Sequence, residues 1–544
     1  MNTRQLQTDK NQKLYHALLG ILLVCAQAMM MLLSYWACKY SYYGAVDGRT
    51  RGVLVGDKTW AHIAVFFAAS LCTMGIDKVL MKKDKSQQEK ICLCTLIVTS
   101  VIAFILGVFY VCKNPYYPVG DQINTTAFAA YCRDGNFSML SIGGYVGMYQ
   151  QQKGLAILYE ILFTLFGDFN YRPAKILHVV WWILTILAGY GFLKLNTDRP
   201  VFRMLYCVMM LGCFPLLFYL PYIYGDVLSI SFGIILFYGV AAYEHSGQKR
   251  YIALASFAAG LAVLARKNTW IVLVAVAVYV LLVSLRKKKV RYLMAGTAIL
   301  LTAALSVKAV DVIYEVRSGY PSGVGIPSIL WVAMGLQETE GRAGVYNRYQ
   351  QATFTDYDCQ QELAAQQGKE YIRERLEEFS QDPGMAFNFF KNKVEGQWIE
   401  PMYAALESTE SFEEGAELSP VLESLYYGEL GRTIWKLTNY YQSILYLAGL
   451  MALVMLGILW WKKKEVPISL WLPWIAVFGG FLFSILWEAK SRYVFPYCVF
   501  MILYAPEGLY QTGLLLCKLP KLRKFKKSGH TQDKGEEASL RETA

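Results

Sequence analysis

Long apolar stretches separated by short polar connections recur along most of the chain. A helix needs about 20 apolar residues to cross a bilayer core of roughly 30 Å. Stretches of this kind predict twelve transmembrane helices, at 15–36, 59–81, 91–112, 174–194, 204–221, 227–243, 251–265, 269–285, 291–312, 441–461, 467–486 and 493–516. The pattern therefore predicts an all-α polytopic membrane protein.

Lysine and arginine are concentrated in the connections that would lie on one side of the membrane. These basic segments are 81–90, 193–203, 247–251, 286–291, 461–465 and 518–527. With twelve spans and both termini in the cytoplasm of a plasma-membrane protein, every one of them is cytoplasmic, as the positive-inside rule requires. The net charge of +12 is thereby explained without a nucleic-acid partner. The loop 37–58 fits worst, because it is predicted outside yet carries Lys39, Arg49, Arg51 and Lys58.

Residues 313–440 form the one sizeable polar segment, which predicts an external, mainly helical domain. Within 338–430 there are 19 acidic and 7 basic side chains, a net charge of −12, whereas the rest of the chain carries 22 acidic and 46 basic ones, a net of +24. The stretch 359–398 predicts two helices broken at Asp382-Pro383-Gly384.

The predicted organisation has four parts. Residues 1–312 form a transmembrane module with an external loop at 113–173, followed by the external domain, three C-terminal spans within 441–516 and a basic cytoplasmic tail at 517–544. The apolar run 154–167 is either a juxtamembrane helix on the outer face or a thirteenth crossing. Its shortness and its Glu160 favour the former.

Four predicted outer loops carry isolated charged residues in otherwise uncharged surroundings. These residues are Asp121, Asp226, the pair Arg266 and Lys267, and the group Glu488, Lys490 and Arg492. Each has an ordinary structural interpretation: Asp226 as a helix N-cap, Glu488 and Arg492 as an i,i+4 pair, and the cations as interfacial anchors. The positive-inside rule nevertheless predicts few cations in outer turns, and two of these turns depart from it.

The chemistry that suits such a set is the binding of a lipid phosphate. The chain has no P-loop, HExxH or GxSxG motif. Arginine and lysine hold phosphate oxygens through charge-assisted hydrogen bonds, and a carboxylate can take a proton from an attacking nucleophile. A sugar carried on a lipid phosphate already has a good leaving group.

In this order the motifs resemble the polytopic C-type (GT-C) glycosyltransferases, in the family-39-like branch related to protein O-mannosyltransferases and the aminoarabinose transferase of lipid A. The resemblance covers about 91–515. It comprises Asp121 in the first large external loop, "LFGDFNYRPAKILHVV", a turn with Asp226, "ARKNTW", and a late E-x-x-x-R-Y-x-x-P from Glu488 to Pro496.

The resemblance implies an inverting transfer of a sugar from a polyprenyl-phosphate donor to a hydroxyl acceptor of the cell envelope, on the extracellular face. It implies Asp121 as general base and donor-phosphate binding by Arg266, Lys267 and Arg492. Sugar-binding or orienting roles go to the remaining positions, which are Asp226, Glu488, Tyr493 and Lys153.

Two departures from the family pattern matter. Where the family usually has two acidic residues after the third span, this sequence has Asp121 followed by Gln122. The sequence therefore requires no cofactor. Binding of a divalent metal by Asp121 or Asp226 remains an open alternative. "QQQKG" replaces "KPP", which leaves Lys153 as the stand-in lysine. A carrier that moves lipid-linked sugars across the bilayer and an inactive scaffold remain alternatives. The sugar and the acceptor are not specified by the sequence.

Overall fold

The computed structural model describes residues 3–46, 51–464 and 466–518. Within these residues, nine helical segments are long and apolar enough to cross a membrane. They are α1 (Thr3–Lys39), α2 (Thr59–Leu80), α3 (Lys85–Lys113), α7 (Arg172–Asn196), α10 (Asp226–Ser246), α12 (Trp270–Lys287) with the preceding 3-10 turn, α13 (Val290–Ser318), α20 (Glu429–Trp461), and α21 (Leu472–Leu486) with its 3-10 turn. The prediction of an all-α multi-pass membrane protein is confirmed.

The predicted number of twelve long spans is wrong, because three of them are shorter or broken. The stretch 204–221 forms α8 (Pro200–Leu211) and α9 (Phe214–Phe218), interrupted at Gly212 and Cys213 just before a proline. Helix α11 (Lys249–Ala265) has only 17 residues. The last stretch forms α22 (Ser491–Met501), a turn, and a further helix from 505 to 518. Proline and glycine interrupt helices locally, whatever the mean hydropathy of the segment.

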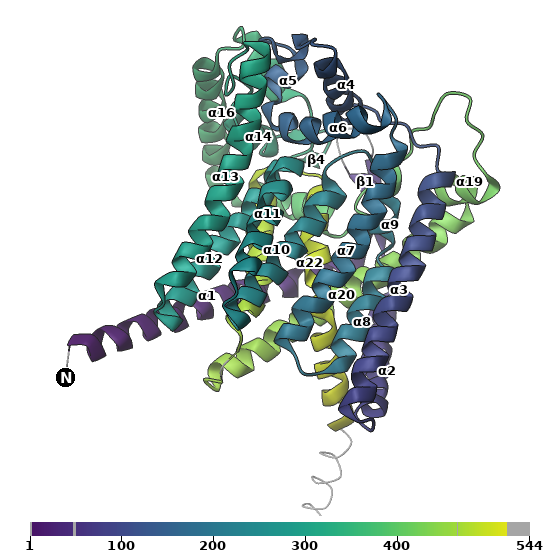
Figure 1. Cartoon of the computed structure of the whole chain (residues 1–544), viewed down its shortest axis with the longest axis vertical. Helices are drawn as coiled ribbons and strands as arrows, with labels where there is room; N and C mark the ends of the chain where they lie inside the picture. Colours follow the sequence, from purple (N-terminus) through teal and green to yellow (C-terminus); the bar gives the residue numbers. More distant parts are fainter. Residues whose placement is uncertain (1–2, 47–50, 465, 519–544) are drawn as a thin grey trace, which may run out of the picture.

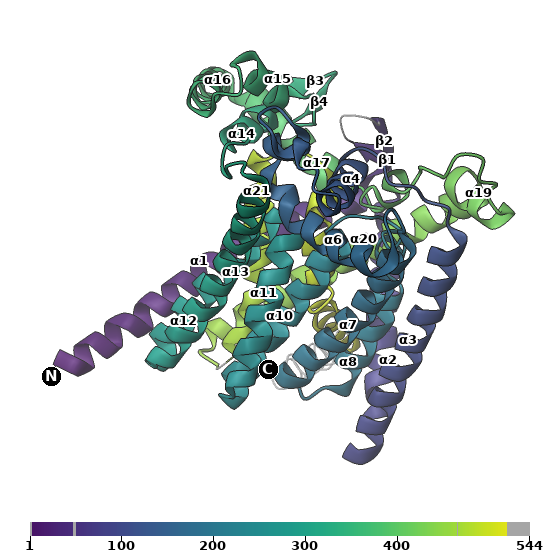
Figure 2. The ribbon, with the colours of Figure 1, turned by 45° about the horizontal axis from the view of Figure 1, so that its top comes forward.

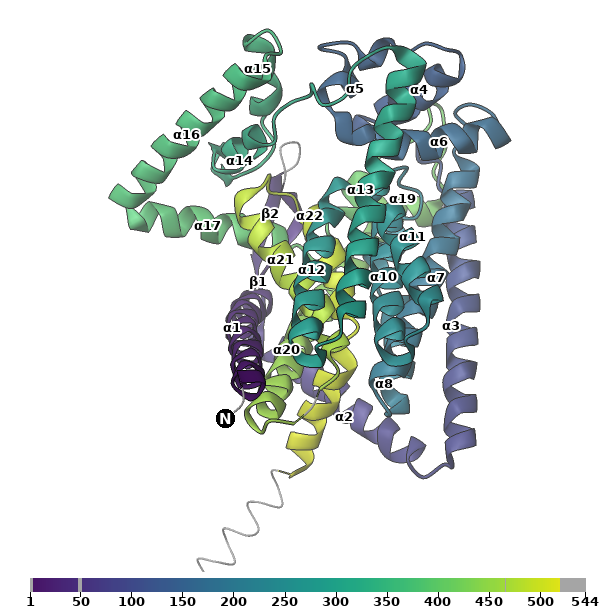
Figure 3. The ribbon, with the colours of Figure 1, turned by 60° about the vertical axis from the view of Figure 1, so that its left-hand side comes forward.

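The helices form one bundle in which α10 is the most buried of the nine candidate spans in the described part of the chain. Helix α10 packs against α7 and α11, α11 packs against α13, and the N-terminal α1 packs along α20 (Figure 1, Figure 3). The α2–α3, α7–α8, α10–α11 and α12–α13 connections all lie at the lower end of the bundle in Figure 1. The basic connections therefore share one end.

The opposite end carries the short helices that follow α3. Helices α4 (Asp121–Arg133), α5 (Tyr145–Met148) and α6 (Lys153–Phe166) lie there together. With 14 residues, α6 is not among the segments long enough to cross a membrane. Its Glu160 forms an ion pair with Arg317 at 2.6 Å, which fastens α6 to the end of α13.

The segment predicted at 313–440 begins within α13, which continues to Ser318, and ends within α20, which begins at Glu429. It contains α14 (Ile329–Gly335), the β3–β4 hairpin (Glu338–Thr339 and Arg342–Ala343), α15 (Tyr349–Asp356), α16 (Gln361–Gln381), α17 (Pro383–Trp398), α18 (Ala405–Ser408) and α19 (Pro420–Tyr427). These elements gather at the same end as α4–α6 (Figure 2). The predicted break is confirmed: Asp382 separates α16 from α17 and its carboxylate accepts the Met385 amide at 2.9 Å.

The loop after α1 is an antiparallel hairpin of β1 (Tyr40–Val46) and β2 (Arg51–Gly56). Arg49 and most of the basic tail, 519–544, lie outside the described residues.

Candidate functional site

Asp121 lies at the first position of α4, where the preceding Gly120 has a φ of 59°. Glycine adopts this left-handed conformation at little cost, so the chain turns sharply into the helix. The Asp121 carboxylate is exposed and accepts a hydrogen bond from the Tyr145 hydroxyl at 2.9 Å. Burial raises the pKa of Tyr145, and the charge of Asp121 raises it further. The phenol is therefore a neutral donor that orients the carboxylate.

A chain of side chains continues from Asp121 to the cations. The Gln152 amide lies 3.5 Å from the Tyr145 hydroxyl and donates to the Tyr224 hydroxyl at 2.6 Å. The Tyr224 ring lies 5.0 Å from the guanidinium of Arg266 and 5.3 Å from that of Arg492. Residues from five separate segments thus form one cluster.

Arg492 is buried, with 6% of its surface exposed. Its guanidinium contacts the rings of Tyr222, Tyr224 and Tyr493 at 5.2–5.5 Å. Among the described residues no carboxylate pairs with Arg492, and its buried Nε has no hydrogen-bond partner. A buried cation with only aromatic partners is costly unless an anion accompanies it.

Arg266 differs from Arg492 in having a carboxylate partner. Asp226 lies 3.4 Å from the Arg266 guanidinium and is itself buried. Helix α10 starts at Asp226, with Gly225 in the cap position, so the N-cap interpretation of Asp226 is wrong. The interaction with Arg266 positions that arginine.

Glu488 is buried beside the same cluster and accepts a hydrogen bond from Tyr493 at 3.4 Å. It precedes α22, so the predicted i,i+4 helical pair with Arg492 does not form within the described structure. Burial raises the pKa of Tyr346, and the charges of both Asp121 and Glu488 raise it further. The two carboxylates therefore act on a common tyrosine.

The loop of Glu488 is held by the polar segment. The Ala489 amide donates to the Gly344 carbonyl at 2.7 Å, and Lys393 from α17 donates to the Gly335 carbonyl. Burial lowers the pKa of Lys393 to about 7, opposed by the charge of Glu488. Elements far apart in the sequence thus fix this loop.

A polar pocket lies next to the cluster. Its wall includes Tyr224, Arg266, Lys267, Glu488 and Tyr493, together with Trp331 and Trp487. The two tryptophan rings stack in parallel, 5.9 Å apart.

A second pocket shares Gln151 and Lys267 with the first. It lies between α6, α11 and α13 and is lined largely by apolar residues such as Val263 and Val307. Lys153 is in its wall, where it forms an ion pair with Asp311 and a 2.8 Å hydrogen bond to Ser322. Its charge is therefore compensated, unlike that of Lys267, which is exposed and has no ion-pair partner in the described part of the chain.

Sequence reasoning missed Tyr145, Gln152 and Lys393. Tyr145 and Gln152 are uncharged and so were not among the isolated charges that the sequence singled out, and Lys393 lies in a segment that carries many other charges. Among the described residues, no group of three or more His, Cys, Asp or Glu side chains is arranged so that it could hold a metal ion. Dependence on a divalent metal stays a prediction.

The fold and the apolar helices define a multi-pass helical membrane protein. No family model, no curated protein and no solved structure matches the chain.

Proposed function

We propose that this protein is a membrane glycosyltransferase that moves a sugar from a polyprenyl-phosphate donor to a hydroxyl acceptor on the outer face of the plasma membrane. One observation carries the proposal: the chain Asp121–Tyr145–Gln152–Tyr224 joins an exposed carboxylate to Arg266 and Arg492. A general base and an anion site in one cluster are the two groups that this reaction needs.

The adjoining pockets support an amphiphilic donor. Lys267 is common to a polar pocket and to one whose exposed lining is mainly apolar. A phosphate near Lys267 would have its sugar on the polar side and its prenyl chain on the apolar side. The uncompensated charges of Lys267 and Arg492 are the groups best suited to the phosphate.

In the proposed reaction the Asp121 carboxylate takes the proton of the acceptor hydroxyl as its oxygen attacks the anomeric carbon. The bond from that carbon to the phosphate oxygen breaks, and polyprenyl phosphate leaves with the bonding electrons. Arg492 and Lys267 stabilise the charge that builds on it, with Arg266 held in place by Asp226. Glu488 and Tyr493 contact sugar hydroxyls. A single displacement of this kind inverts the anomeric configuration.

The test is release of polyprenyl phosphate by the purified protein supplied with lipid-linked sugar. Asp121→Asn should lower kcat by about 10²–10⁴-fold, as for other positioned bases. Asp134→Asn, at the exposed C-terminal cap of the same helix, is the matched control and should leave turnover intact. Near wild-type turnover of Asp121→Asn would remove Asp121 from the mechanism.

A further inference from the structure

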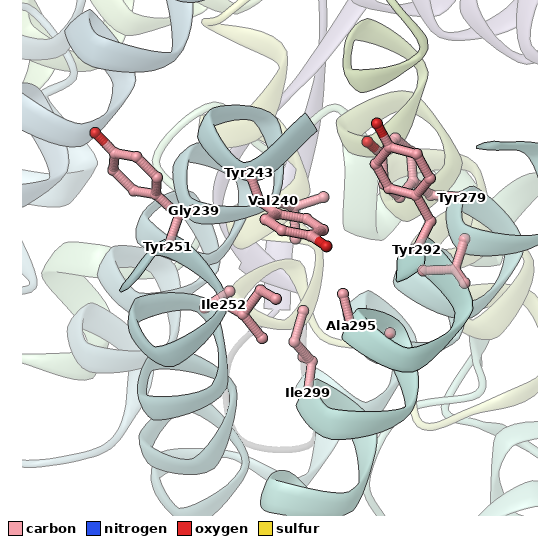
Figure 4. Close-up of a pocket in the computed structure, with 12 residues that line it drawn as sticks. Gly239, Val240, Tyr243, Tyr251, Ile252, Tyr279, Tyr292, Ala295 and Ile299 are labelled. Carbon is pink, nitrogen blue, oxygen red and sulfur yellow. The ribbon is translucent and has the colours of Figure 1, made fainter. Parts of the chain in front are cut away.

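A separate apolar pocket lies between α10, α11, α12 and α13, at the end that carries the basic connections. Figure 4 shows Val240, Ile252 and Ile299 around it, with Tyr251 on one side and Tyr292 on the other. Four small residues shape its wall: Gly239, Ala255, Ala295 and Gly296. A Cβ on Gly296 would lie 2.5 Å from a Val280 methyl group, so glycine lets α13 approach α12 there.

Two exposed arginines cover the tyrosines on the two sides of this pocket. The Arg250 guanidinium lies 4.9 Å from the Tyr251 ring, and its Nη2 donates to that hydroxyl at 3.3 Å. Arg291 lies 4.9 Å from the Tyr292 ring and donates to its hydroxyl at 2.9 Å. Within the described residues neither guanidinium has an ion-pair partner.

Glu244, whose carboxylate contacts the pocket residue Tyr279, does not compensate them. Glu244 is buried, forms an ion pair with Lys287 at 2.8 Å and accepts the Tyr279 hydroxyl at 2.6 Å. The rim of the pocket therefore keeps its positive charge while its wall is apolar. This combination suits one class of molecule, an amphiphile with an anionic head.

We propose that this pocket binds an anionic glycerophospholipid of the cytoplasmic leaflet. One acyl chain lies along the surface groove where α11 and α13 meet, at the mouth of the pocket, and the phosphate lies between Arg250 and Arg291. Basic pockets between helices on the cytoplasmic side bind acidic head groups, and an arginine fork matches the geometry of phosphate oxygens. The site is at the opposite end of the bundle from Asp121, so it does not depend on the proposed transferase activity.

The test counts lipids bound to the full-length protein by native mass spectrometry, with phosphatidylglycerol and phosphatidylcholine as probes. Phosphatidylglycerol should bind more tightly. The double variant Arg250→Gln/Arg291→Gln should weaken its binding by about 30-fold, since each cation near an anionic surface contributes about fivefold. The control Lys82→Gln/Lys83→Gln removes two exposed charges from the α2–α3 turn and should change little.

A second pair of variants tests the acyl chain. Ile252→Trp fills the pocket and should also weaken phosphatidylglycerol binding, whereas Phe257→Trp, on the exposed face of the same helix, should not. The proposal is overturned if the double arginine variant binds like the wild type, if the lysine control loses as much, or if Ile252→Trp has no effect. Displacement of phosphatidylglycerol by inorganic phosphate would overturn the lipid assignment in favour of free phosphate.

Discussion

Replacing Arg492 with methionine separates a role in binding the donor from a role in holding the fold. The guanidinium is buried among three tyrosine rings and has no carboxylate partner among the described residues. An arginine that stabilises a fold is normally paired with a carboxylate. Replacing such an arginine leaves the buried carboxylate without a counter-charge, which destabilises the protein. Arg492→Met leaves no carboxylate unpaired within the described structure. It should therefore lower turnover strongly without a matching loss of stability.

The magnitudes follow from the contacts. Three cation–π contacts to a buried guanidinium contribute about 2 kcal/mol each, so the variant loses about 6 kcal/mol. It also removes an uncompensated buried cation, which costs several kcal/mol to desolvate. The two effects are of similar size, so we expect a free energy of unfolding close to that of the wild type. Turnover should fall a hundredfold or more, because a well-placed group that stabilises developing charge contributes about 3 kcal/mol.

The assay measures the thermal midpoint of the ligand-free protein and kcat for polyprenyl-phosphate release on the same preparation. Arg492→Lys keeps the charge without the forked geometry and should recover part of kcat. Arg432→Met, which removes an exposed arginine paired with Glu429 at 2.6 Å, serves as the control for loss of one positive charge.

Two results would refute this reasoning. If Arg492→Met keeps a large part of the wild-type kcat, the guanidinium does not contact the leaving phosphate. If the midpoint falls by more than about 5 °C, the tyrosine cage needs the cation for folding and the arginine is structural.

Three further predictions concern neighbouring groups. Tyr145→Phe removes the hydrogen bond to the Asp121 carboxylate and should lower kcat about tenfold with little change in KM. The reason is that a hydrogen bond to a charged group contributes about 1.5 kcal/mol or more. If the variant has the kinetics of the wild type, the phenol does not orient the base. Lys393 binds its proton up to about pH 10.5 when unfolded but releases it near pH 7 when folded, so the unfolded state holds more protons between these values and the thermal midpoint should rise with pH across that window. Lys393→Met should abolish that rise, and a rise that persists would assign it to another group. Asp382→Ala removes the cap that accepts the Met385 amide and should cost about 1 kcal/mol, measured as faster proteolysis of the α16–α17 corner; Asp382→Asn, which keeps the cap, should not.

The membrane class and most helices follow from the sequence because the length and hydropathy of a segment are local properties. Nine spans were found in the described residues where twelve were predicted. The break between α8 and α9 was underestimated because averaging over an apolar window hides a single glycine and proline. The break between α16 and α17 was predicted because its Asp-Pro-Gly signal stands in polar surroundings.

The sequence alone also identified most of the charged residues that later met in space, since a charge in an apolar stretch is visible without coordinates. It could not say which of them are compensated. Asp226 with Arg266, and Lys153 with Asp311, are pairs between helices, whereas Arg492 and Lys267 have no ion-pair partner within the described structure. Compensation depends on distances of a few ångströms between remote segments, because the Coulomb energy of two charges falls with their separation and with local burial. Only tertiary packing sets both.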